Sequence, residues 1–145
     1  MYDAILTLHS LVRWLVLAAA TWAVITAWRG LAGGLPWGRG ARVAGALLAA
    51  TADTQLLLGL ALWLALSPHA VLGGGAGSAW WTWVHPALGV LVVVLAHLGS
   101  VRARKAPEGP GRWRTFAAFA TAALLATALA VPWPFLGGGR SLLPF

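Results

Sequence analysis

The stretch ILTLHSLVRWLVLAAATWAVITAW, residues 5–28, decides the fold class of this chain, because Arg13 is its only charged residue. A helix rises 1.5 Å per residue, so these residues would form one about 36 Å long, enough to cross a hydrocarbon layer about 30 Å thick. No Lys or Arg precedes the stretch, Asp3 is acidic, and the apolar run is longer than the core of a typical secretion signal. We therefore interpret it as a retained membrane span.

Three more stretches have the same apolar character, at about residues 43–66, 80–101 and 116–136. Connections rich in Gly and Pro separate them, and the whole chain of 145 residues is 60% hydrophobic and 9% charged. Short connections favour antiparallel neighbours. The sequence predicts an all-α membrane protein, in which residues 1–145 form a single domain: a four-transmembrane-helix, up-down-up-down bundle.

The basic residues gather in two of the connections between spans. These residues are Arg29, Arg39 and Arg42 after the first span, and Arg102, Arg104, Lys105, Arg112 and Arg114 after the third. The connection between the second and third spans has no Lys or Arg, and the tail after the fourth has only Arg140. By the positive-inside rule we expect both termini outside the cytoplasm. The basic residues that give the net charge of +7 are then expected to interact with lipid headgroups and not with nucleic acid.

His9 and His85 lie near the starts of the first and third spans, so an alternating topology places both at one membrane depth. Small residues follow each histidine on its own helical face: Val16, Ala20 and Ala23 after His9, and Gly89, Val92, Ala96 and Gly99 after His85. Such a face lets a neighbouring helix approach closely, or leaves room for a flat macrocycle. The sequence leaves both interpretations open.

The first and third helices of such a bundle are commonly diagonal, so the two imidazoles would face each other across it. That arrangement suits the iron of a haem b with His9 and His85 as axial ligands and Gly89 beside the ring. The absence of Cys excludes covalent haem attachment, iron–sulfur clusters and disulfides. Arg13, one turn from His9, suits a haem propionate or a lipid headgroup. A copper or zinc site that includes His69 is an alternative.

A second polar level is expected deeper in the membrane, where Asp53 of the second span and His97 of the third reach similar depths. A carboxylate beside an imidazole would make a hydrogen bond between helices, a proton relay or a second site. His97 lies 12 residues after His85, about 120° away around the helix. This offset favours one haem near the outer face over two stacked haems.

Seven short motifs resemble a family of small four-span bacterial membrane proteins called cytochrome b-like. They are Leu8-His-Ser-Leu-Val-Arg-Trp14, Asp53-Thr-Gln-Leu-Leu-Leu-Gly-Leu60, Leu66-Ser-Pro68, His85-Pro-Ala-Leu88, Leu95-Ala-His-Leu-Gly99, Arg102-Ala-Arg-Lys105 and Val131-Pro-Trp-Pro-Phe135. The resemblance runs across nearly the whole chain and implies a four-helix fold and bound haem. His9, Arg13, Asp53, His85 and His97 fall at motif positions of the family.

We expect a b-type haem protein of the bacterial cytoplasmic membrane that transfers electrons, or senses or delivers haem, with a redox protein or quinone as partner. One alternative is a non-catalytic subunit or assembly factor of a respiratory complex, with a quinone pocket; a homo-oligomer is also open. Another is a small proton or solute transporter that uses Asp53 and His97. With three acidic residues and no nucleophile–base pair, the chain does not look like an enzyme in its own right.

Overall fold

The computed structural model describes residues 1–67, 70–74 and 78–134. This part of the chain is helical and contains no strand. Its elements are α1 (Tyr2–Ala32), α2 (Arg39–Ala61), the π-helix η1 (Leu62–Leu66), the short 3₁₀-helix η2 (Val71–Gly73), the π-helix η3 (Trp80–Val84), α3 (His85–Lys105) and α4 (Pro110–Ala130). Within the described ranges, four helical segments are long and apolar enough to cross a membrane. The predicted four-helix fold class is confirmed.

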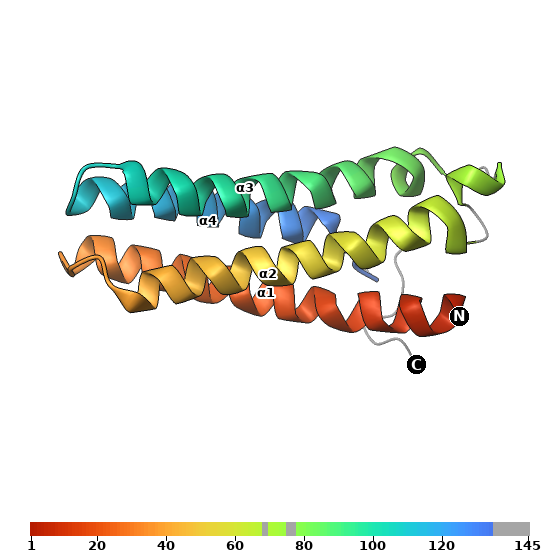
Figure 1. Ribbon diagram of the computed structural model, residues 1–145, viewed down its shortest axis with the longest axis horizontal. Coiled ribbons are helices and arrows are strands. Elements are labelled where there is room, and N and C mark those ends of the chain that lie inside the picture. The colour runs from red at the N-terminus through yellow and green to blue at the C-terminus, as the bar shows by residue number, and fades with distance from the viewer. Residues whose placement is uncertain (68–69, 75–77, 135–145) are drawn as a thin grey trace.

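The four long helices form an up-down-up-down bundle in which sequence neighbours run antiparallel (Figure 1). Each helix packs on two others, and the packed pairs are α1–α2, α2–α3, α3–α4 and α1–α4. Hence α1 and α3 lie diagonally across the bundle. We call the end with connections 33–38 and 106–109 the basic end, and the end with the start of α1 and the start of α3 the cavity end.

The helix ends follow from Gly and Pro. Gly34 after α1 and Gly109 before α4 have φ values of +59° and +77°, which glycine adopts without a steric penalty. Pro110 opens α4, since the first turn of a helix needs no N–H from it. As a result α4 begins earlier than the expected span 116–136 and ends at Ala130, before two prolines. Residues 135 and 136 of that span, and His69, lie outside the described residues.

The core of the bundle is built mainly from alanine and fills the basic end. Its large members there are Leu48, Trp113 and Phe116, packed among alanines of all four helices. The indole N–H of Trp113 donates to the Leu35 carbonyl oxygen at 2.7 Å, and Trp37 packs edge-on against Trp113. Trp113 thereby ties α4 to the α1–α2 connection.

Two glycines let the helices approach closely in this half of the molecule. A Cβ atom on Gly30 would stand 2.4 Å from the Trp113 ring, and one on Gly99 would stand 2.6 Å from Phe119 Cβ. Real Cβ atoms do not come this close to other heavy atoms. The basic end is therefore packed to the limit that glycine allows.

Candidate functional site

The cavity end of the bundle is hollow. A cavity of about 450 Å³ lies there, lined by residues from all four long helices. This volume is within the range of small-molecule and cofactor sites, roughly 300–1,000 Å³. All four predicted cofactor residues, His9, Arg13, His85 and Gly89, line it. The described lining does not include Asp53 or His97.

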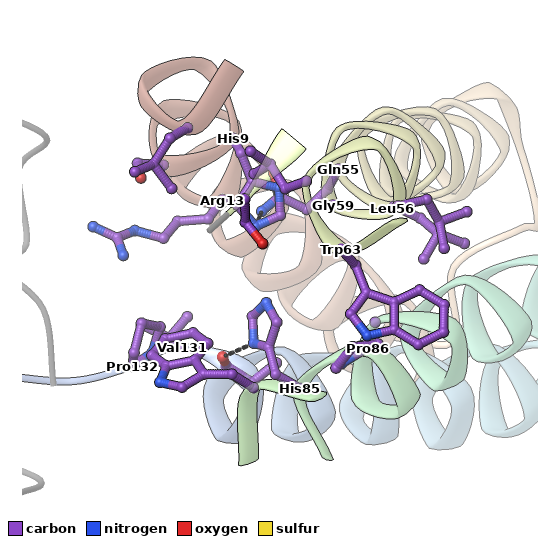
Figure 2. A pocket seen from close by; sticks show the side chains of 18 of the residues that line it. His9, Arg13, Gln55, Leu56, Gly59, Trp63, His85, Pro86, Val131 and Pro132 are labelled. Atoms are coloured by element: carbon purple, nitrogen blue, oxygen red, sulfur yellow. Dashed lines mark hydrogen bonds between the residues drawn. The ribbon is translucent and has the colours of Figure 1, made fainter. Parts of the chain in front are cut away.

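His9 on α1 and His85 on α3 face each other across this cavity (Figure 2). Their ring centroids are 6.1 Å apart and the ring planes make an angle of 66°. Two imidazole nitrogens that each lie about 2 Å from one metal ion are about 4 Å apart. Adding the half-width of each ring gives a centroid separation of the size observed. The diagonal helices thus hold two imidazoles at a spacing that would suit one metal ion between them.

The sequence after α4 fixes the tautomer of His85. In a continuing helix, the Ala130 carbonyl oxygen would accept from the N–H four residues later, but that residue is Pro134, which has none. The His85 Nδ1 lies 2.9 Å from this oxygen. A carbonyl can only accept, so Nδ1 is the donor (Figure 2). In the neutral ring the lone pair is then on Nε2, the usual ligand atom of a histidine oriented in this way.

A proline leaves a backbone carbonyl to a ring N–H at two further positions near the site. Pro86 has no N–H for the Thr82 carbonyl, which accepts from the indole N–H of Trp63 at 2.8 Å. Pro132 likewise leaves the Ala128 carbonyl to the indole N–H of Trp133, also at 2.8 Å. In each case a proline leaves a helix carbonyl without its backbone donor, and a side-chain ring N–H donates to that carbonyl instead. These hydrogen bonds fix the ring side chains at the cavity end.

A π-helix directly precedes His85. The backbone N–H of His85 donates to the carbonyl of Trp80, five residues earlier, because η3 has the wider π-helical turn. Single π-helical turns occur frequently at functional sites, where they change the direction of a side chain. The π-helical turn and Pro86 together position His85 at the first residue of α3.

His9 is held by α2. Its Cε1 lies 3.1 Å from the point where a Cβ on Gly59 would stand, so glycine makes room for the ring. The side-chain nitrogen of Gln55 lies 3.2 Å from His9 Nε2 and donates to it in this arrangement. Nδ1 of His9 and Oε1 of Gln55 are buried and have no hydrogen-bond partner among the described residues. Buried polar atoms without partners are rare in proteins, so this pair indicates a ligand-binding environment.

Arg13 lies in the cavity wall and is 8% exposed. Figure 2 shows its side chain extending away from the two imidazoles, along the gap that separates them. The Arg13 Cζ is 5.2 Å from the ring centroid of Trp14. The guanidinium therefore lies inside the bundle at one edge of the cavity.

Gly89 lies one helical turn after His85 and lines the cavity. A Cβ there would meet only Leu56 Cδ1, at 3.7 Å, which is an ordinary contact. Helix packing therefore does not require glycine at this position. A longer side chain would extend into the cavity.

Asp53 and His97 form the expected pair, with His97 Nε2 at 3.0 Å from Asp53 Oδ1. The pair lies on the outer surface of the bundle, with the Asp53 side chain 44% and the His97 side chain 53% exposed. It is separate from the cavity. Among the described residues, no group of three or more His, Cys, Asp or Glu side chains is placed to hold a metal ion.

Sequence reasoning missed the contribution of α2 and η1 to the site, above all Gln55 and Gly59 on α2 and Trp63 on η1, which all line the cavity. These residues are spaced four apart and so share one helical face. A polar residue followed at this spacing by a glycine and a tryptophan is a signal that could have placed this face beside His9.

The chain has no match among protein-family models, curated proteins or solved structures. The resemblance to cytochrome b-like proteins therefore stays a prediction. A functional assignment has to rest on the geometry of the cavity.

Proposed function

We propose that the chain is a membrane b-type haem protein that binds one haem in the cavity, with His9 and His85 as axial ligands. The observation that carries the proposal is the pair of imidazoles, 6.1 Å apart, that the diagonal helices present inside a cavity of about 450 Å³. A haem held in this way supplies one-electron chemistry. Transfer of electrons, or sensing or delivery of haem, would follow.

The residues around the cavity fit such a group. The buried Nδ1 of His9 and Oε1 of Gln55 have no partner among the described residues, so this part of the chain leaves polar atoms at the site for a bound group. Arg13 offers a guanidinium at one edge, suited to a propionate, because it pairs with carboxylates through two parallel hydrogen bonds. The glycine at position 89 leaves the wall beside His85 without a side chain.

The chain's own groups would orient the ligands. The Ala130 carbonyl accepts a hydrogen bond from Nδ1–H of His85, and this leaves the lone pair of the neutral ring on Nε2. His9 has to exchange its hydrogen bond with Gln55 for the metal. Loss of one such hydrogen bond costs about 1 kcal/mol, a small penalty beside the formation of a metal–ligand bond.

The test is a visible absorption spectrum of the protein purified in detergent, oxidised and then reduced. We expect a Soret band that shifts on reduction, and its complete loss in His9→Ala and in His85→Ala. His97→Ala is the matched control, since it removes an imidazole outside the cavity, and it should keep the wild-type spectrum. A colourless protein that haem does not reconstitute, or an unchanged spectrum in both variants, would overturn the proposal.

A quinone-binding subunit of a respiratory complex is the second candidate, and the contact between His9 and Gln55 favours it. With Gln55 donating to His9 Nε2 at 3.2 Å, the proton of His9 is on Nδ1, where it can donate to a ligand carbonyl. Gln55→Leu distinguishes the two candidates. It should retain haem, because it releases His9 Nε2, whereas it should weaken a quinone by removing the group that fixes the His9 proton.

We also propose that the bundle spans the bacterial cytoplasmic membrane with the cavity end outside. The basic residues at the other end support this orientation. Since the chain has no Cys, single-cysteine variants can test it in intact cells. Leu72→Cys, in η2, should react with a membrane-impermeant thiol reagent, and Leu35→Cys, exposed in the connection at the basic end, should not; the reverse result would invert the orientation.

A further inference from the structure

The hydrogen-bonded pair of Asp53 and His97 lies on the outer surface, at a depth that the hydrocarbon layer of the proposed membrane would surround. His97 Nε2 is 3.0 Å and 3.1 Å from the two carboxylate oxygens of Asp53. Asp53 is eleven residues from Arg42 and His97 is five residues from Arg102, distances of about 16 Å and 8 Å along the helices. Their side chains lean toward each other, because each points to the N-terminus of its own helix. Both therefore meet between the headgroup level and the membrane centre.

Lipid cannot satisfy such a pair. About half of each side chain is uncovered, at 44% for Asp53 and 53% for His97. Charged and strongly polar groups in the hydrocarbon layer cost several kcal/mol, and almost always face protein or a water-filled cavity. The surface around the pair has to be covered in the membrane.

The helices that carry the pair are also the least covered of the four. In the apolar stretches of the segments that contain α2 and α3, 17% of the residues are buried within the chain. The corresponding share is 39% in α1 and in α4. On α2, beside Asp53, the exposed side chains of Ala46, Ala50 and Thr54 are four residues apart. Small residues at this spacing allow another helix to approach closely in a membrane.

We propose that this surface, formed by α2 and α3 around Asp53 and His97, binds a second copy of the chain. With His97 protonated, the pair is self-complementary: one ring N–H donates to Asp53, Nδ1–H is a second donor, and the carboxylate has further lone pairs to accept. A twofold axis places the donor of each copy on the carboxylate of the other. The four groups then carry no net charge, so the two pairs do not repel each other.

Cysteine cross-linking tests the surface directly, because the chain contains no Cys. Thr54→Cys lies beside Asp53, and Leu125→Cys is the control on α4, also fifteen residues from the start of its helix and 60% exposed. Oxidation in native membranes should give a disulfide-linked dimer of twice the chain mass with Thr54→Cys, at least tenfold more than with Leu125→Cys. Equal yields, or a product with a different protein, would overturn the proposal.

The double variant Asp53→Leu/His97→Leu supplies a second readout that does not depend on cross-linking. It replaces the pair by apolar side chains that lipid can cover, so each chain should fold and stay helical. We expect the wild type to have the mass of a dimer in mild detergent and the double variant that of a monomer. A double variant that stays dimeric, or a monomeric wild type, would overturn the proposal. Haem binding at the other site is not affected by either result.

Discussion

The two ends of this bundle use the same residue types for opposite purposes. At the basic end, Gly30 and Gly99 face Trp113 and Phe119 so closely that a Cβ would stand 2.4 Å and 2.6 Å from them. At the cavity end, a Cβ on Gly89 would contact only Leu56 Cδ1, at 3.7 Å. A glycine on an apolar helix therefore closes a bundle where a bulky aromatic residue faces it. Gly89, which has no aromatic atom near its Cβ position, instead borders a cavity.

The stripe that starts at His85 on α3 contains both situations on one helical face. Gly99, at its far end, contacts α4, and Val92 and Ala96 in the middle are buried. His85 and Gly89, at its near end, line the cavity. Close helix approach is therefore confirmed at Gly99, whereas the near end of the stripe borders a cavity, and a macrocycle bound there stays a proposal.

The largest effect on folding that we expect comes from adding a methyl group at the basic end. Gly30→Ala and Gly99→Ala should each lower the free energy of unfolding by about 1–3 kcal/mol, because Trp113 or the Phe119 stem has to move. Unfolding in mixed detergent–SDS micelles, followed by circular dichroism, measures the change. If both variants match the wild type, the two ends do not differ in packing as described.

A smaller effect is expected from the proline that frees the Ala130 carbonyl. Pro134→Ala supplies an N–H that competes with His85 for this oxygen, and so loosens the orientation of the imidazole. Partners of metal-binding histidines typically account for about 10–100-fold in metal affinity, and we expect the lower end of that range for haem. A haem titration monitored at the Soret band measures it. Unchanged affinity would show that this hydrogen bond does not prepare the site.

The smallest effect on stability is expected at Gly89. Gly89→Ala should leave the free energy of unfolding within about 1 kcal/mol of the wild type, since its Cβ makes one ordinary contact and alanine favours the helix. Measured beside Gly99→Ala under the same conditions, it gives the contrast between the two ends on one helix. A loss as large as that of Gly99→Ala would mean that the cavity end is closely packed.

Much of the fold follows from the sequence, because length, apolar character and short connections leave few arrangements for four spans. The placement of His9, Arg13, His85 and Gly89 around one space also followed, since two helical faces at equal depth had to meet across the bundle. The length and spacing of the apolar stretches and the helix periodicity of 3.6 residues were together sufficient for these predictions.

The remaining features depend on how each helix is rotated against its neighbours, which periodicity does not specify. Gln55 is two residues from Asp53, about 200° around the helix, and this angle alone does not show that it reaches His9. The pairing of Asp53 with His97 was expected, yet its exposure was not, because Ala52 and not Asp53 takes the buried position on α2. The π-helical turn before His85 contains Thr82, whose carbonyl accepts a hydrogen bond from the distant Trp63, a contact that periodicity does not predict.

The central claim is that the hollow end holds one haem between His9 and His85. Its most direct test is a titration of the purified, haem-free protein with haem, followed by absorption and by electron paramagnetic resonance of the ferric form. The account predicts saturation at one haem per chain and a low-spin, six-coordinate signal typical of two imidazole ligands, which His9→Ala or His85→Ala converts to high spin or abolishes. No saturable binding, or a low-spin signal that persists without both histidines, would contradict it.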